Sequence, residues 1–146
     1  MVRIFVDGAS AGNPGYAGAG IFVQPDEGEN EFISIPLGTM TNHEAEFAAV
    51  LEALKLCETR DWNIISINTD SKLVDEAVEK RHTKKSMFRP YLLEILNRMD
   101  SSELCFLKWI PSKQNRAADK LAKQAIQEYT KRNEMESEGK RGNNSF

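Results

Sequence analysis

The chain has 146 residues, of which 40% are hydrophobic and 28% charged, proportions typical of a single globular domain with a sizeable core. Its formal net charge is −3, which excludes a global basic field, so any nucleic-acid binding must depend on local patches. No apolar stretch reaches the length of a membrane span, and Arg3 and Asp7 interrupt the N-terminal apolar run that a signal peptide would need. We therefore expect a cytoplasmic protein without a membrane segment.

The predicted elements alternate in the manner of a mixed α/β domain. Apolar runs bounded by turn residues predict five strands, at residues 2–7, 17–24, 32–37, 64–69 and 104–110. Capping residues and helical periodicity predict four helices, at residues 43–59, 71–79, 88–99 and 115–132. Either Thr41 or Asn42 is expected to cap the first helix.

The order of these elements predicts a mixed sheet with helices on its faces. The first three strands follow one another as an antiparallel meander, and strands that are joined through helices should lie parallel to a neighbour. The most apolar strands, at 2–7, 64–69 and 104–110, are expected to be central or covered. Residues 133–146 are polar and contain glycine, so we expect a domain at 1–132 followed by a disordered tail at 133–146.

The cysteines, Cys57 and Cys105, lie in apolar surroundings, and their spacing suggests neither a metal site nor a redox pair. We expect free, buried thiols in a reducing compartment.

The first predicted strand ends on a carboxylate, Asp7, and a glycine-rich turn follows it. An ionised Asp inside a strand is costly unless it is paired, hydrogen-bonded or bound to a metal. The alternative is a hairpin in which Asp7 only caps the turn.

The first predicted helix also carries an acid on its inner face. At about 100° per residue, Glu46 falls on the same line as Val50, Ala53 and Cys57, which face the core. Glu44 falls on the opposite side, where we expect it to be solvated.

Asp70 and Asp119 lie at the margins of their elements. Asp70 ends the fourth strand, at an edge where sites form in sheets with parallel strands, although it is equally suited to cap the next helix. Asp119 lies at the border of the apolar arc of the last helix, and taken alone it fits a surface acid. Clustered carboxylates raise one another's pKa values, and hard divalent cations with oxygen ligands relieve that repulsion.

Four segments in this order resemble the type 1 ribonuclease H family. They are FVDGASAGNPG at 5–15, TNHEAE at 41–46, TDS at 69–71, and the stretch from Trp109-Ile110 to NRAAD at 115–119. The resemblance spans residues 2–129. It implies a five-stranded mixed sheet in which strands one to three are antiparallel and strands four and five run parallel to strand one.

The resemblance also implies a site and an activity. Asp7, Glu46, Asp70 and Asp119 would hold two Mg²⁺ or Mn²⁺ ions. The reaction would be hydrolysis of the RNA strand of RNA–DNA hybrids, leaving 5′-phosphate and 3′-hydroxyl ends. The residues matching those that contact backbone and ribose in the family are Asn13, Thr41, Asn42 and Ser71. We expect a monomer without an obligate protein partner.

Two features depart from many members of the family. The link before Asp119 is short, and Lys113 stands nearest the place of the catalytic-loop His, which archaeal and short bacterial forms of the family also lack. The basic handle is reduced to a run from Lys80 to Arg89 that includes Lys84 and Lys85, which either binds phosphates or is a solvated loop. These departures leave two alternatives open, a non-catalytic nucleic-acid-binding or partner-binding protein on the same fold, and a metal-dependent nuclease that acts on DNA.

Overall fold

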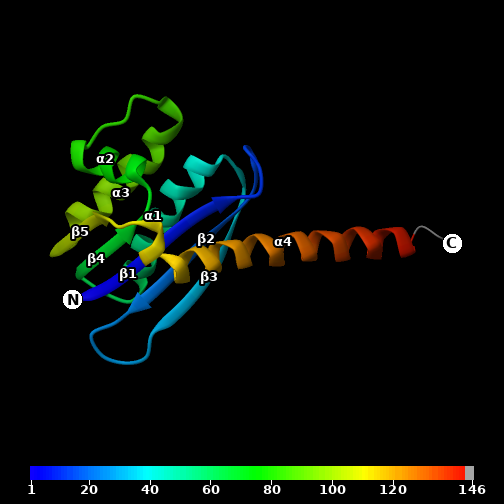
Figure 1. The fold of residues 1–146 in the computed structure, drawn as a ribbon, viewed down its shortest axis with the longest axis horizontal. Coiled ribbons are helices and arrows are strands. Elements are labelled where there is room, and N and C mark those ends of the chain that lie inside the picture. Colours follow the sequence, from blue (N-terminus) through cyan, green and yellow to red (C-terminus); the bar gives the residue numbers. More distant parts are fainter. Residues whose placement is uncertain (144–146) are drawn as a thin grey trace.

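A five-stranded mixed sheet with helices on both faces forms the body of the protein (Figure 1). The structure is a computed structural model that describes residues 1–143, with side chains described for residues 1–137. The strands are β1 (Val2–Ser10), β2 (Gly15–Gln24), β3 (Glu31–Met40), β4 (Ile64–Thr69) and β5 (Leu104–Trp109). The helices are α1 (Asn42–Thr59), α2 (Lys72–Lys80), α3 (Arg89–Ser101) and α4 (Arg116–Asn143), with 3₁₀ turns at Ser86–Phe88 and Ser112–Gln114.

The strand order is β3-β2-β1-β4-β5, which confirms the expected fold. β1 pairs antiparallel with β2, and β2 pairs antiparallel with β3, whereas β4 lies parallel to β1 and β5 parallel to β4. The β1–β4 register ends at Val6 opposite Thr69, so Asp7 and Asp70 follow on neighbouring parallel strands. The topology therefore brings two of the predicted acids to one edge of the sheet.

The two faces of the sheet are covered differently. On one face, α1, α2 and α3 enclose the main core, whose fully buried side chains include Ile4, Val6, Phe47 and Ile67. On the other face, α4 packs against β1, β2 and β3, and its far end extends beyond the strands (Figure 1).

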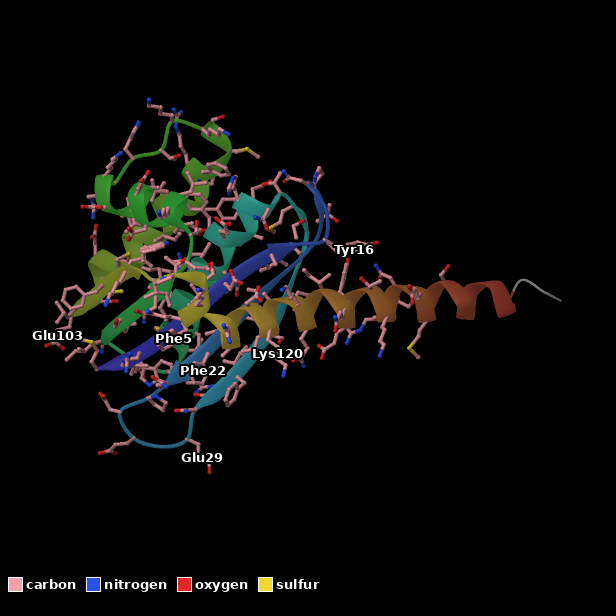
Figure 2. The ribbon with its side chains drawn as sticks, viewed as in Figure 1. Phe5, Tyr16, Phe22, Glu29, Glu103 and Lys120 are labelled. Carbon is pink, nitrogen blue, oxygen red and sulfur yellow. The ribbon has the colours of Figure 1, made fainter. Side chains whose placement is uncertain are left out.

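α4 leaves part of its face of the sheet open. Phe5 and Phe22 lie on the sheet beyond the start of α4, which carries Lys120 (Figure 2). The ring centroids of Phe5 and Phe22 are 5.7 Å apart, and those of Phe22 and Phe32 are 4.9 Å apart. These rings pack against one another on the part of the sheet that no helix covers.

The prediction that the fifth strand is central or covered was wrong, because β5 is an edge strand. Leu104 and Phe106 are 43% and 49% exposed, and they alternate with partly buried residues such as Leu107. Apolar residues occur on both faces, which resembles a buried strand, but helices cover only one face, and Lys108 lies on the open face with Leu104 and Phe106.

α1 begins with a capping box that corrects the prediction for Glu44. Thr41 is the N-cap, and its hydroxyl oxygen accepts from the Glu44 amide at 3.2 Å. The Glu44 carboxylate accepts from the Thr41 amide at 3.2 Å and from the hydroxyl of Tyr91 at 3.3 Å. Glu44 is therefore a partly buried structural residue rather than a solvated one, because capping contacts do not follow the helical periodicity.

α4 also differs from its prediction, since it continues past Arg132 to Asn143. Residues 133–137 include strong helix formers such as Glu134 and Met135, and no proline interrupts the helix. The division of the chain at residue 132 stays a prediction, and residues 144–146 lie outside the described part. Within that part, no helix has both the length and the apolar character needed to cross a membrane.

The two cysteines are free, as expected, but only Cys57 is fully buried, whereas Cys105 in the edge strand β5 is partly buried. Burial raises the pKa of Cys57 to about 12 and that of Cys105 to about 11. Both thiols are therefore protonated at neutral pH, which makes them poor nucleophiles.

Candidate active site

The four predicted acids come from four different elements around the carboxyl ends of β1 and β4. Asp7 lies in β1, Asp70 directly follows β4, Glu46 lies in α1, and Asp119 lies in the first turn of α4. The glycine-rich segment after Asp7 continues β1 to Ser10 before it turns, so Asp7 does not cap the turn.

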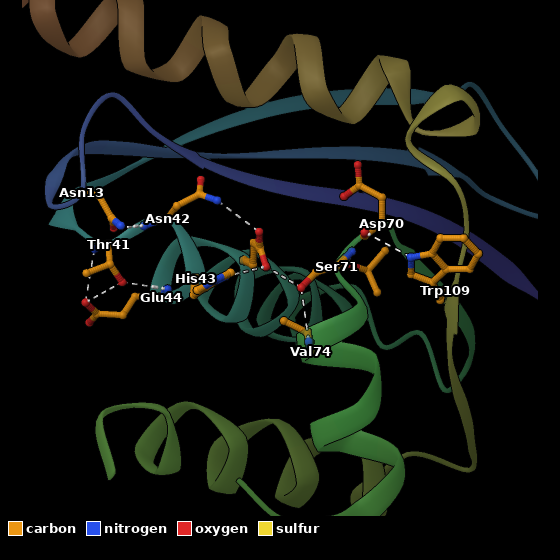
Figure 3. Close-up of polar contacts among 11 residues, drawn as sticks. Asn13, Thr41, Asn42, His43, Glu44, Asp70, Ser71, Val74 and Trp109 are labelled. Atoms are coloured by element: carbon orange, nitrogen blue, oxygen red, sulfur yellow. Dashed lines mark hydrogen bonds and ion pairs between the residues drawn. The ribbon is translucent and has the colours of Figure 1, made fainter. Parts of the chain in front are cut away.

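The end of β4 shows that Asp70 does not cap α2. Ser71 is the N-cap, and its hydroxyl accepts from the Val74 amide at 3.2 Å. The Asp70 carbonyl accepts from the indole Nε1 of Trp109 at 3.2 Å (Figure 3). The carboxylate of Asp70 thus has no capping role and is available to the site.

Glu46 lies on the inner side of α1, as its periodicity predicted, with its side chain 18% exposed. Its carboxylate accepts from the hydroxyl of Ser71 and from Asn42 Nδ2 at 3.3 Å, and it lies 3.5 Å from His43 Nδ1 (Figure 3). α1 comes this close to β1 because Gly8 has no side chain, and a methyl group there would overlap the Ala45 carbonyl.

Asp119 is held at the border of the sheet by close packing of α4. Gly20 lies opposite Asp7 in the β1–β2 pair, and a methyl group there would overlap the Ala118 carbonyl of α4. The Asp119 carboxylate, 43% exposed, accepts from Lys123 Nζ at 2.9 Å. The border position predicted from the sequence thus places Asp119 beside the sheet rather than in bulk solvent.

Asp70 and Asp119 lie close enough to Asp7 to affect its ionisation. The pKa of Asp7 is raised from 3.8 to about 8, first by burial and then by the carboxylates of Asp70 and Asp119. Glu46 is connected to this group through Ser71, which follows Asp70 in the chain.

An all-carboxylate donor set of this kind fits hard divalent cations, which prefer oxygen ligands and would relieve the repulsion at Asp7. Among the side chains described, no three His, Cys, Asp or Glu residues already lie around one point as metal ligands do. The fit therefore rests on the donor chemistry and on the raised pKa of Asp7.

The predicted backbone and ribose contacts form one network beside Glu46. The Asn42 amide donates to Asn13 Oδ1 at 3.2 Å, and Thr41 caps the same helix (Figure 3). Ser71 joins the network through Glu46. These hydroxyl and amide groups lie together although their residues are far apart in the sequence.

The predicted basic contacts lie in two other places. Lys84 and Lys85 line a hollow of about 340 Å³, together with His43, which also contacts Glu46. The hollow therefore adjoins Glu46 through His43. Lys113 is exposed in the Ser112–Gln114 turn that leads into α4.

Arg81, in the basic run from Lys80 to Arg89, contacts another part of the protein. It forms an ion pair with Asp100 at 2.6 Å, so its charge is partly neutralised within the protein. The run is thus neither a uniformly free basic surface nor a purely solvated loop.

Sequence reasoning assigned no role to Asn115, which is 1% exposed. Its Nδ2 donates to the Val6 carbonyl at 2.8 Å, while its Oδ1 is buried without a hydrogen-bond partner in the described part. This contact ties the start of α4 to the residue that precedes Asp7. The available signal was a polar residue at the start of a predicted helix, which resembles an ordinary cap.

Comparisons with known proteins agree with this geometry. The family model described as "Reverse transcriptase-like" matches residues 5–125. The "Putative hydrolase EbsB" of Enterococcus faecalis is 40% identical over 131 residues, which cover 88% of this chain and 96% of that protein. A ribonuclease H of Rickettsia massiliae is 35% identical over 138 residues, covering 84% of this chain and 89% of that protein.

Solved structures show the same likeness. RNase H1 from Halobacterium salinarum superposes with a TM-score of 0.81 at 26% identity, covering 87% of this chain and 98% of that one. LC11-RNase H1 in complex with an RNA/DNA hybrid gives a TM-score of 0.80 at 25% identity, covering 89% and 99%. Fold, sequence and family model therefore agree, and this chain belongs to the type 1 ribonuclease H family.

Proposed function

We propose that this protein is an endoribonuclease that hydrolyses the RNA strand of RNA–DNA hybrids, leaving 5′-phosphate and 3′-hydroxyl ends. The observation that carries the proposal is the group formed by Asp7, Asp70 and Asp119, in which the pKa of Asp7 rises to about 8. The ribonuclease H relatives and the hybrid complex of LC11-RNase H1 support the substrate class.

Asp7, Glu46, Asp70 and Asp119 would together hold two divalent ions, Mg²⁺ or Mn²⁺. When bound, such ions activate the attacking water and stabilise the charge on the phosphate. The residues of the chain supply the negative oxygen ligands and hold them in place. Ser71 and Asn42 fix the Glu46 carboxylate by hydrogen bonds, while the pairing of β1 with β2 fixes Asp7 and the end of β4 fixes Asp70.

The network beside Glu46 would distinguish RNA from DNA. A 2′-hydroxyl both donates and accepts, and in a hybrid it lies in a wide, shallow groove that side chains can reach. Asn13, Thr41, Asn42 and Ser71 present amide and hydroxyl groups of matching character along that route. Lys84 and Lys85 in the adjoining hollow would contact backbone phosphates, which bind cationic side chains without regard to sequence.

The link before α4 limits how protons can move at this site. A histidine can exchange a proton near neutral pH, whereas a lysine ammonium has three donors and no acceptor. We therefore propose that Lys113 contributes positive charge to a phosphate and does not shuttle protons. An enzyme of this kind should be slow and should work faster as the pH rises.

The test is incubation of end-labelled RNA–DNA hybrid, duplex DNA and duplex RNA with the protein, in Mg²⁺ and in Mn²⁺. We expect cleavage of the hybrid alone. The products should carry 5′-phosphates, which a phosphatase removes. Asp70→Asn should abolish cleavage. Glu44→Gln is the matched control, because glutamine keeps the capping box of α1 and Glu44 lies outside the acid group.

Several outcomes would contradict the proposal. Full activity of Asp70→Asn would refute the assignment of the acids. Hybrid binding without cleavage in either metal would favour a non-catalytic binding protein, and cleavage of duplex DNA would favour a DNA nuclease.

A further inference from the structure

Trp109, the last residue of β5, contacts the main chain at one of the proposed metal-ligating acids. Its indole N–H donates to the Asp70 carbonyl at 3.2 Å, and its side chain is partly buried (Figure 3). Trp109 lies opposite Thr69 in the β4–β5 register, and the next amide, of Ile110, donates to the Thr69 carbonyl at 2.8 Å. The indole bond thus extends the β4–β5 ladder beyond its last pair, by means of a side chain.

The residues on either side of Asp70 are held by other contacts. Thr69 Oγ1 accepts from the Ser71 amide at 3.1 Å, and the Ser71 hydroxyl binds Glu46 and caps α2. The contact to Asp70 comes from the Trp109 indole, which donates a hydrogen bond to the main-chain carbonyl of Asp70.

The ring of Trp109 has a second contact that orients it. Lys72, the first residue of α2, places its Nζ 4.9 Å from the ring centroid, within the range of a cation–π interaction. The indole is therefore fixed between the main chain at the end of β4 and a cation at the start of α2.

We propose that Trp109 is a positioning residue that acts through Asp70. The side chain of an aspartate is short, so the direction of its carboxylate follows the orientation of its main chain. By holding the Asp70 carbonyl, the indole N–H directs the carboxylate toward Asp7. This inference rests on the proposed function, and it assigns the β5 end a role in metal binding that is separate from substrate contact.

The test uses the fact that the chain has two tryptophans. Trp109→Phe keeps an aromatic ring but removes the N–H donor. Trp62→Phe is the matched control, since Trp62 precedes β4 at the opposite end of that strand and stacks with Arg60, 5.5 Å from its ring centroid. Partners that orient metal ligands typically account for about 10- to 100-fold in metal affinity or activity.

We expect Trp109→Phe to raise the apparent dissociation constant for Mn²⁺, measured by calorimetry, by about tenfold. It should lower kcat for the hybrid by a similar factor and leave KM within about twofold, because the substrate contacts are untouched. Trp62→Phe should leave the Mn²⁺ dissociation constant, kcat and KM within about twofold of the wild type.

A spectroscopic measurement can be made on a variant that retains the Trp109 indole. In Trp62→Phe, Trp109 is the remaining tryptophan, and paramagnetic Mn²⁺ bound beside Asp70 should quench its fluorescence saturably. Adding Asp70→Asn should weaken that response about tenfold or more. This measurement does not depend on whether Trp109→Phe folds.

Three results would overturn the inference. They are Mn²⁺ affinity and kcat within twofold of the wild type in folded Trp109→Phe, no fluorescence response in Trp62→Phe at Mn²⁺ concentrations that saturate calorimetric binding, and a wild type that binds no Mn²⁺. A wild type that binds Mn²⁺ but does not cleave the hybrid would refute the proposed activity alone, and the metal titrations would still decide the role of Trp109.

Discussion

Replacing Asp7 with asparagine should change how the stability of the metal-free protein depends on pH. The pKa of Asp7 in the folded protein is about 8, against 3.8 for an ordinary Asp, so the folded state holds this proton more tightly than the unfolded chain does. The contribution of Asp7 to stability is therefore most favourable below the ordinary pKa and is lost as the pH rises toward the folded pKa. Asn resembles the protonated carboxyl but cannot ionise.

The size of the effect follows from the raised pKa. Each pH unit between the unfolded and folded pKa values costs about 1.4 kcal/mol, so going from pH 5 to pH 7 costs roughly 3 kcal/mol. Above about pH 8 the loss levels off. A loss of this size is a large fraction of the stability of an ordinary domain.

The assay is urea unfolding of the wild type and of Asp7→Asn between pH 5 and pH 9, in the presence of a chelator. The free energy of unfolding of the variant, relative to the wild type, should increase by roughly 3 kcal/mol from pH 5 to pH 7. Added Mg²⁺ or Mn²⁺ should stabilise the wild type and reduce this difference, since cations favour the ionised carboxylate. A difference that stays constant within about 0.5 kcal/mol would refute the reasoning, because all other titrating groups are common to both proteins.

Three further predictions concern regions outside the acid group. The double substitution Lys84→Ala and Lys85→Ala should raise KM for the hybrid and flatten the salt dependence of binding, and an unchanged salt slope would show that the loop makes no phosphate contact. Lys113→Ala should slow cleavage far less than Asp70→Asn, and the pH–rate profile should climb into the alkaline range. A histidine-like inflection that disappears in His43→Ala or in His82→Ala would contradict this account. Truncation after Arg132 should leave the melting temperature and hybrid cleavage nearly unchanged, and a marked loss of activity would mean that the end of α4 binds substrate.

Most of the fold was predictable because short apolar runs and turn residues alternate clearly along the chain. The inward position of Glu46 followed from helical periodicity, whereas the sequence left Asp70 open between a site at the edge where parallel strands end and a cap of the next helix. The position of Asp119 was predictable only as a border, because its closeness to Asp7 depends on how α4 packs on the sheet. Periodicity describes one element at a time and cannot show how closely two elements pack.

The errors have the same origin. The fifth strand is predominantly apolar, and Lys108, which shares a face with Leu104 and Phe106, was too weak a local signal to show that this face stays open. Glu44 was assigned to solvent because its bonds to Thr41 and Tyr91 are set by a cap and a neighbouring helix, not by its face of α1. The hydrogen bonds of Asn115 and Trp109 join residues far apart in the sequence, so they became visible only in the folded chain.

The two glycines that flank Asp7 in space have a consequence for how this family can vary. A methyl group on Gly8 would push α1, which carries Glu46, away from β1, and a methyl group on Gly20 would push α4, which carries Asp119, away from β2. Substitutions there should move the acids apart in space although all four acids remain in the sequence. A survey of sequences that counts only the four acids would therefore class as active some chains whose acids are held too far apart. The residues at positions 8 and 20 should be inspected together with the acids.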